Sequence, residues 1–266
     1  MKLPCLSSVV IGGHIVTKLR QSPSRKMHTN KILARLLKHG RLTQLTIGCH
    51  LTDSDVQEIS NLTNDSLPGN EHLTSLSIRG TIDALDFFLA NTAPSLRTLE
   101  IVLPEHYAQS DRDVCESILR FTNLTELCLN TWHLDALPPD GFAALGQMNH
   151  LKVLKITPGW QDNLVESSWT DLPGSSWTNN DFGEWISNFT ELRELELLWR
   201  SSCLDENAMA AIGHSCQKLE RCTLGWVQDI DTWTALEDHT SVLFPRLKKL
   251  GICVVDGQSQ QLQQVS

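Results

Sequence analysis

The stretch APSLRTLEI (93–101) indicates how this chain folds. It contains a leucine followed by apolar residues three and five positions later, which gives the pattern L-x-x-L-x-L with isoleucine at the last position. FPRLKKLGI (244–252) has the same spacing, and PCLSSVVIGG (4–13) fits it with Leu6, Val9 and Ile11. One such motif is weak evidence because leucine is common, so the number of copies decides its meaning.

Nine copies of the motif occur along the 266 residues. Most of the first leucines lie 27 to 31 residues apart, with exceptional steps of 36, 23 and 41 residues. A recurring period of this length is typical of a repeat protein. Val9 and Cys222 replace the middle leucine, and we expect Cys222 to be a small buried apolar residue. The copies are Leu6–Ile11, Leu42–Ile47, Leu73–Ile78, Leu96–Ile101, Leu124–Leu129, Leu151–Ile156, Leu192–Leu197, Leu219–Leu224 and Leu247–Ile252.

Each copy has the residue pattern of a short strand. Its second and third apolar positions lie two residues apart, so they share one face of an extended chain. Polar residues such as Thr46, Lys155 and Glu196 occupy the position between them, which predicts one buried face and one solvated face.

The segments between the strands have helical patterns. Apolar residues occur at helical spacing in 29–40, 53–62, 180–189 and 205–216, and Ser54 with Gln57 is spaced as a capping box for the second of these. A strand followed by a helix, repeated along the chain, requires parallel strands because each helix returns the chain to the same end of the sheet. The sequence therefore predicts an α/β solenoid with about nine parallel strands.

The chain resembles the leucine-rich-repeat (LRR) family over nearly its whole length. LTQLTIGCHLTDSDVQEIS (42–60) and LDENAMAAIGHSCQKLERCTL (204–224) are similar to the cysteine-containing repeats of F-box/LRR proteins, with a Cys near the strand end, then L-T/D-D/E, then a helix. The resemblance implies a horseshoe with its strands on the concave side and its helices on the convex side. The Asn or Cys that usually lies eight residues after the first Leu is replaced here, for example by Thr81 and Trp132, so we expect an irregular horseshoe.

The same pattern predicts the domain organisation. We expect residues 1–257 to form a single LRR solenoid with a long Trp-rich loop inserted at 158–181. Residues 258–266 are rich in Gln and predict a polar, disordered tail. Because a repeat strand begins at Leu6 without a polar cap before it, we expect an N-terminal cap or an upstream domain to be missing from this chain. The F-box of the resembling family would lie upstream, and no such segment is visible in the sequence.

Composition argues against several classes of protein. The net charge is −9, from 31 acidic and 22 basic residues, which disfavours a nucleic-acid partner. No apolar run reaches the length of a membrane span, and the N-terminus lacks the apolar region and cleavage site of a signal peptide. The eight cysteines show no zinc-site spacing, so we expect free thiols in a reducing compartment, cytoplasmic or nuclear.

The sequence contains no recognisable catalytic motif. The patterns G-x-S-x-G, H-E-x-x-H and the phosphate-binding P-loop are all absent. Cys128 falls on the predicted solvated face, but no neighbouring base activates it as a nucleophile. We therefore expect no enzymatic activity, no cofactor and no structural metal.

Tryptophans mark the predicted partner site. Trp199 and Trp226 each lie seven residues after a first leucine, at the same rim of adjacent strands, and the long loop that carries three more leaves from that rim. Trp is a frequent interface anchor, although these side chains could instead fill the space of the missing Asn ladder. The predicted partner-binding residues are Trp199, Trp226, Leu198, Arg193, Glu194, Glu196, Arg221, Trp160, Trp169 and Trp177.

The expected function is that of a protein–protein interaction module. Its ligand would be a protein bound on the concave face and the C-terminal rim of the strands, with no nucleic acid and no membrane partner. The resemblance implies the substrate-recognition part of an F-box-type (SCF) ubiquitin ligase subunit, provided that an F-box lies upstream. The alternatives are a stand-alone LRR scaffold, a GTPase-regulating LRR protein and an extracellular LRR receptor. The free cysteines and the lack of a signal peptide disfavour the last of these.

Overall fold

The computed structural model describes most of the chain in stretches separated by gaps. The chain divides into two compact units, Met1–Asn123 and Leu124–Ser266, and each unit is described by itself. The described residues are 7–11, 23–38, 42–63, 72–90, 95–102, 114–131, 143–158, 178–198, 206–227, 243–256 and 259–265.

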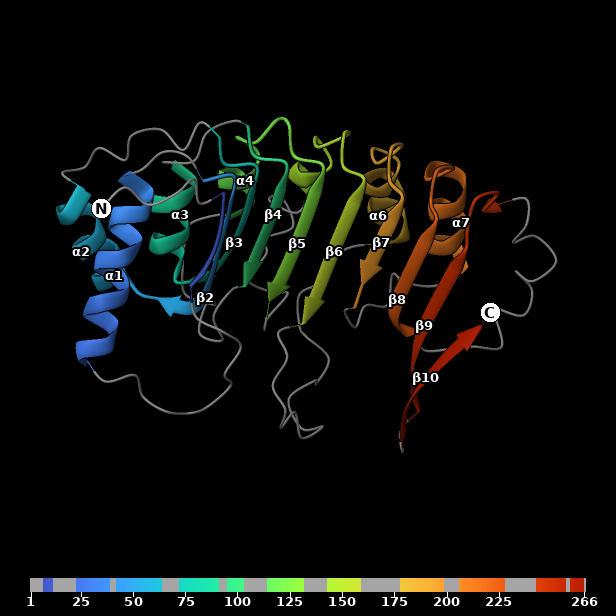
Figure 1. Cartoon of the computed structure of the whole chain (residues 1–266). Helices are drawn as coiled ribbons and strands as arrows, with labels where there is room; N and C mark the ends of the chain where they lie inside the picture. Colours follow the sequence, from blue (N-terminus) through green and yellow to red (C-terminus); the bar gives the residue numbers. More distant parts are fainter. Residues whose placement is uncertain are drawn as a thin grey trace. The chain divides into compact units, whose positions relative to one another are not determined.

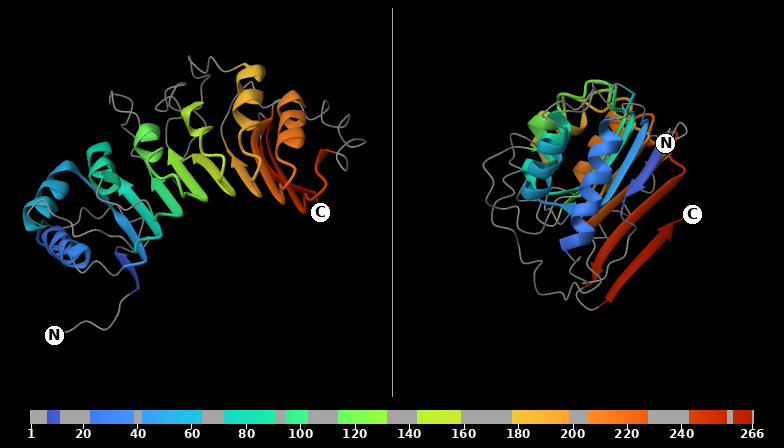
Figure 2. Two further views of the ribbon diagram at one scale, coloured as in Figure 1. Left: turned by 90° about the horizontal axis from the view of Figure 1, so that it is seen from above. Right: turned by 60° about the vertical axis from the view of Figure 1, so that its left-hand side comes forward.

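The first unit alternates strands with helices. Its strands pair in parallel and in chain order, and its helices lie together on one side of them (Figures 1 and 2). The elements are β1 (Ser8–Ile11), α1 (Pro23–Lys38), β2 (Gln44–Leu51), α2 (Asp53–Thr63), β3 (Ser75–Gly80), α3 (Ile82–Ala90), β4 (Thr98–Val102) and α4 (Val114–Ile118).

The second unit continues the same pattern. Strands β5 to β9 pair in parallel and in chain order, and α6 and α7 lie on one side of them (Figure 1). The last strand, β10, pairs with β9 in the antiparallel direction. The elements are β5 (Glu126–Thr131), β6 (Val153–Pro158), α6 (Asn179–Ile186), β7 (Glu194–Leu197), α7 (Glu206–Ser215), β8 (Arg221–Val227), β9 (Lys249–Asp256) and β10 (Ser259–Val265).

These observations confirm the predicted α/β fold class. Nine parallel strands follow one another in chain order, four in one unit and five in the other, and helices separate most of them, as in an LRR-like repeat solenoid. No helix among the described residues is long and apolar enough to cross a membrane.

The L-x-x-L-x-L motif supplies the core of both units. In the seven copies from Leu42 to Leu224, all three apolar positions are at most 3% exposed. Cys222 is 0% exposed, which confirms that it replaces a core leucine. The first and last copies are covered less completely, because Val9 and Ile11 and their counterparts in β9 are only half-buried.

A repeated backbone contact sets the register between copies. Within each unit, the carbonyl of the residue after a first leucine accepts two N–H groups from the next copy. The Lys152 carbonyl, for instance, accepts hydrogen bonds from the N–H groups of Arg193 and Glu194 at 2.8 and 3.0 Å. Ser7, Thr43 and Thr74 provide equivalent acceptors in the first unit. Each copy is therefore fixed to the preceding one just before its strand begins.

Helix α6 shows how the sequence anchors a helix to the sheet. Phe182, Trp185, Ile186 and Phe189 are at most 3% exposed, as their helical spacing predicts, and the ring of Trp185 lies edge-on to that of Phe189 at 4.9 Å. Thr178 caps the helix, since its side chain accepts from the Asp181 N–H while the Asp181 carboxylate accepts from the Thr178 N–H.

The buried stripe of α2 differs from the predicted one. Asp55, Ile59 and Thr63 are buried, whereas Val56 and Leu62 are only half-buried. Asp55 can be buried because its carboxylate is fully used: it accepts from the Thr52 N–H at 2.8 Å and from the buried amide of Asn30 at 3.0 Å. The cap of this helix is therefore Thr52 with Asp55, and the prediction of a Ser54–Gln57 capping box is wrong.

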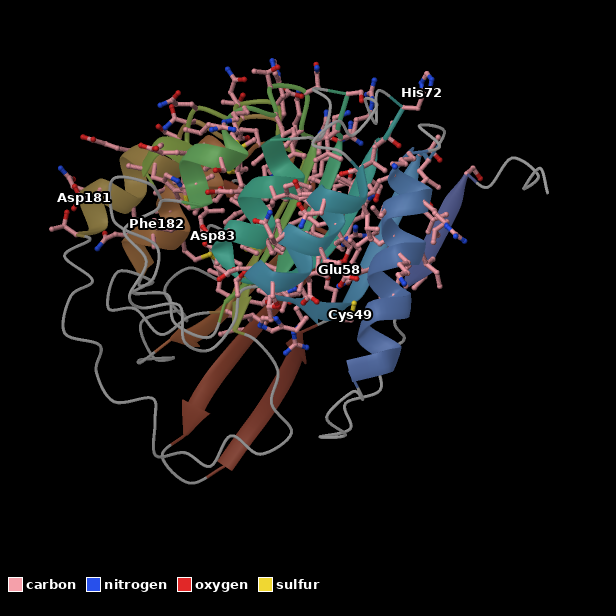
Figure 3. The ribbon with its side chains drawn as sticks, turned by 90° about the vertical axis from the view of Figure 1, so that its left-hand side faces the viewer. Cys49, Glu58, His72, Asp83, Asp181 and Phe182 are labelled. Atoms are coloured by element: carbon pink, nitrogen blue, oxygen red, sulfur yellow. The ribbon has the colours of Figure 1, made fainter. Side chains whose placement is uncertain are left out.

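A second amide contact ties the same two helices together. The Asn30 side chain also donates to the carboxylate of Glu58, which Figure 3 labels on α2, at 2.7 Å. Asn30 lies on α1 and is 2% exposed, so a buried polar contact supplements the apolar packing of α1 against α2.

The end of the chain also differs from expectation. Residues 259–265 were predicted to belong to a disordered tail, but they form β10, which pairs along its length with β9. Without β10, the outer edge of β9 would present unpaired backbone groups, which a hairpin satisfies.

We predict that Leu154→Ala lowers the free energy of unfolding by about 3 kcal/mol, because Leu154 is 0% exposed within β6. Val153→Ala is the matched control: Val153 is the neighbouring, half-buried residue of the same strand, and its loss should cost less than about 1 kcal/mol. Urea denaturation followed by circular dichroism measures both values. Equal losses in the two variants would contradict the assignment of the buried face.

Candidate functional site

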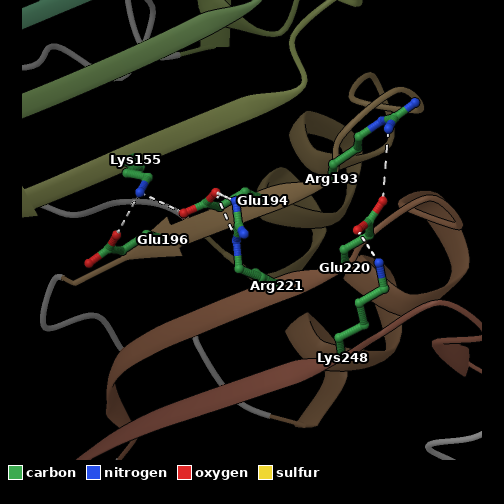
Figure 4. A network of polar contacts seen from close by, with 7 residues as sticks. All are labelled: Lys155, Arg193, Glu194, Glu196, Glu220, Arg221 and Lys248. Carbon is green, nitrogen blue, oxygen red and sulfur yellow. Dashed lines mark hydrogen bonds and ion pairs between the residues drawn. The ribbon is translucent and has the colours of Figure 1, made fainter.

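The register of β6 to β9 places charged side chains in rows across the face opposite α6 and α7. Glu194 lies beside Arg221, Arg221 lies beside Lys249, and Lys155 lies beside Glu196. Outward residues of adjacent parallel strands are close neighbours because the strands are about 4.8 Å apart. Opposite charges therefore meet across the strands at Glu194–Arg221 and Lys155–Glu196 (Figure 4), whereas Arg221 and Lys249 are neighbouring cations.

Glu194 is the centre of the first group of ion pairs. Its carboxylate accepts from Lys155 Nζ at 2.6 Å and from Arg221 Nε at 2.9 Å. Lys155 also lies 3.6 Å from a carboxylate oxygen of Glu196. Four side chains from three strands thus form a continuous network, in which one carboxylate is shared by two cations (Figure 4).

Glu220 is the centre of a second group, one residue before the strands. Lys248 Nζ lies 2.6 Å from its carboxylate, and a terminal nitrogen of Arg193 lies 3.8 Å from it (Figure 4). These three residues all follow the first leucine of their motif copy, so the same backbone contact that sets the register also aligns this row.

The cations of both groups stand farther out than the carboxylates. The Arg221 side chain is 60% exposed and that of Glu194 only 15%, and the corresponding values for Lys248 and Glu220 are 73% and 32%. The Arg193 side chain, at 56%, is likewise more exposed than that of Glu220. The outermost layer of charge on this face is therefore positive.

The networks hold these groups in their charged forms. Burial by itself would raise the pKa of Glu194, but its hydrogen bonds with Lys155 and Arg221 outweigh this effect and lower the pKa below the ordinary 4.5. Burial would lower the pKa of Lys155, but the contacts with Glu194 and Glu196 raise it above 10.5. The hydrogen bond from Lys248 is the main cause of the lowered pKa of Glu220. At neutral pH all of these groups are ions.

Four of the predicted partner-binding residues belong to these networks, namely Arg193, Glu194, Glu196 and Arg221. Leu198, which follows β7, is half-buried and its N–H donates to the Ile156 carbonyl at 2.9 Å. A Cβ on Gly225 of β8 would lie 3.0 Å from the Leu198 backbone, so the glycine allows the two strands to approach closely at this point.

The predicted tryptophan positions are largely outside the described residues. Trp160, Trp169, Trp177 and Trp199 fall in the gaps, and Trp226 lies on β8 with a side chain that is not described. The clustering of these five residues stays a prediction. Trp185 on α6, by contrast, is 3% exposed and belongs to the core.

The comparisons with known proteins do not identify a relative. No protein-family model matches the chain, and no curated protein matches it closely enough to assign a family.

Two of the described cysteines, Cys216 and Cys222, are not suited to nucleophilic chemistry. Cys216 and Cys222 are buried free thiols, and burial raises the pKa of Cys216 to about 12 and also raises that of Cys222. Cys128 is half-buried at the outward position of β5 that alternation predicts. Among the described residues, no three His, Cys, Asp or Glu side chains are grouped closely enough to hold a metal ion.

The sequence prediction of the site missed three of its members. Lys155, Glu220 and Lys248 complete the two networks, but they carry no aromatic or motif signature. Aligning the motif copies at their first leucines would have found them. Lys155 falls at the same offset as Glu196, and Arg193, Glu220 and Lys248 share another offset.

We predict that Glu194→Gln lowers the free energy of unfolding at pH 7 by about 1 kcal/mol, because Lys155 and Arg221 lose the carboxylate that they share. The lowered pKa of Glu194 means that its contribution is present above the ordinary pKa of 4.5 and is lost as the pH falls through the lowered value. The variant should therefore lose less stability than the wild type between pH 5 and pH 3, as urea denaturation at each pH would measure.

Glu184→Gln is the matched control for this prediction. Glu184 is an exposed carboxylate on α6 of the same unit, away from the strand networks. Its variant should keep the wild-type pH profile. If the free energy of unfolding of Glu194→Gln depended on pH in the same way as that of the wild type, the shared carboxylate would not couple folding to pH.

Proposed function

We propose that this chain is a protein-binding repeat module whose ligand lies across the outward face of β6 to β9. The observation that supports the proposal is the ordered charged surface on that face. Its ion pairs align across four strands, and no described helix or strand covers them (Figures 1 and 4). Partly exposed ion pairs add little to folding, so their alignment favours a role in recognition.

We further propose that the module is the substrate-recognition part of an F-box-type ubiquitin ligase subunit. The support is the parallel, LRR-like architecture together with the cysteine-containing repeats at 42–60 and 204–224. Sequencing the transcript upstream of the codon for Met1 tests this step directly. An F-box there would support it, whereas a signal peptide would favour a receptor and the absence of both would favour a stand-alone scaffold.

The binding proposal predicts that substitutions on the outward face of β6 to β9, called the open face below, abolish capture of the partner. Substitutions on the helices, on the other side of the sheet, should not. Lys152→Glu with Lys249→Glu changes the open face, and Lys31→Glu with Arg35→Glu makes the same change in charge on the helix side, at α1. Cross-linking of the tagged chain in cells, followed by mass spectrometry, compares the proteins that each variant captures. We expect a specific set to be lost only from the open-face variant, and identical sets from both variants would reject the proposal.

The tryptophan hypothesis predicts a separate result for Trp199→Ala and Trp226→Ala. If these side chains are interface anchors, each variant should lose roughly 2 kcal/mol or more of binding free energy for the captured protein, with little change in melting temperature. Trp185→Ala is the control for a core tryptophan, because Trp185 is 3% exposed and its loss should destabilise the fold by about 3 kcal/mol or more. Early melting of Trp199→Ala and Trp226→Ala would instead assign them to the core.

A further inference from the structure

The outward face of β6 to β9 is basic although the whole chain is acidic. The stretches 151–156, 191–198, 218–225 and 246–252 contain eight Lys or Arg residues and four Glu residues, which gives a local charge of +4 in a chain of net charge −9. The stretches include the four strand motifs and the residues that lead into them. The positive charge is therefore a property of this face.

The arrangement of the side chains strengthens this effect. All four carboxylates of the stretches are only half-exposed, whereas six of the eight cations are exposed. A ligand that approaches this face meets the cations before the carboxylates. We refer to the exposed cations as the basic strip, which consists of Lys152, Arg193, Arg221, Arg246, Lys248 and Lys249.

At its β9 end, the strip contains cations without an ion-pair partner among the described residues. Within the described part of the chain, neither Arg246 nor Lys249 has an ion-pair or hydrogen-bond partner for its side chain. Lys249 lies in register beside Arg221, another cation. Like charges at directly opposed positions destabilise a sheet, and an anion bound between them would relieve the repulsion.

We propose that the basic strip binds an acidic segment of a partner protein, one rich in Asp or Glu. This inference rests on the binding function proposed above and names the chemical class of the ligand. Carboxylates of the segment pair with Arg246, Lys248 and Lys249. They also reach the N–H groups of Arg221 that Glu194 leaves free, since Glu194 engages only two of its nitrogens.

The width of the cation row favours a peptide over a nucleic acid. Glu194, Glu196 and Glu220 lie among the cations and oppose either polyanion, so they do not discriminate between the two ligands. The next outward row contains Lys155, Glu196, Thr223 and Gly251, so it provides a single cation and no second track for phosphates. A short acidic peptide needs only the narrow row of cations at the strand starts.

The test measures binding of a fluorescein-labelled decaglutamate peptide to the full chain by fluorescence anisotropy at low and moderate NaCl. Arg246→Gln with Lys248→Gln and Lys249→Gln should weaken binding about tenfold, because three exposed charge pairs are lost. Glu220→Gln should tighten binding about threefold, since it releases Lys248 and Arg193 from their carboxylate. Added salt should weaken binding to the wild type.

The control variant removes the same amount of charge elsewhere. Lys31, Arg35 and Lys38 are exposed on α1 in the first unit, and their replacement by Gln should leave peptide affinity unchanged. An uncharged Gly-Ser peptide should not bind. Circular dichroism melting verifies that each variant is folded.

Three results would overturn the inference: no binding of decaglutamate to the wild type, equal affinity for the strip and α1 variants, or tighter binding of oligouridine than of the peptide. The cross-linking experiment on the open face distinguishes this failure from failure of the binding function. If the open-face variant still loses its captured proteins while decaglutamate does not bind, only the acidic nature of the ligand is wrong.

Discussion

Each strand of this protein is too short to bury its own apolar face, so its stability depends on the adjacent copy of the motif. Two interactions join one copy to the next: stacking of the three buried apolar residues and the paired N–H groups received by one carbonyl. Lys152 shows the second interaction, because its carbonyl accepts from both Arg193 and Glu194. This contact fixes the register before the strand begins, and the buried positions then coincide along the whole series.

The same register dictates the pattern of charge on the opposite face. A residue at a given offset from its first leucine must lie beside the residue at that offset in the next copy, as Glu194 lies beside Arg221. When the residues at one offset of two adjacent copies have opposite charges, the parallel strands place them side by side and they attract each other. The fold thus determines which positions are neighbours in the networks around Glu194 and Glu220. The sequence determines which charge occupies each of these positions.

The fold could be predicted from the sequence where one periodic pattern decides it. The motif predicted the strands, their alternation with helices predicted the parallel direction, and the helical spacing of apolar residues in 180–189 predicted the buried stripe of α6. The stripe of α2 could not be predicted, because Asp55 is buried only through its bonds to Thr52 and Asn30, and Asn30 lies on another helix. Pairing of β10 depends on an open edge at β9 and leaves no periodicity in its Gln-rich sequence. In the site, four of the charged residues were predicted and Lys155, Glu220 and Lys248 were missed, because their layering depends on side-chain lengths and contacts that spacing does not encode.

That layering is the feature that folding does not explain. Partly exposed ion pairs contribute at most about 1 kcal/mol each, so the protein would fold nearly as well with neutral residues at these positions. Neutralisation of one charged side chain by another does not explain the layering either, because Arg246 and Lys249 have no carboxylate partner among the described residues. A carboxylate that lies below its cation, as Glu194 lies below Arg221, orients the longer side chain and leaves part of its guanidinium exposed to solvent. Arginine and lysine held in this way lose less side-chain freedom when an external anion arrives, and such preorganisation favours binding more than stability.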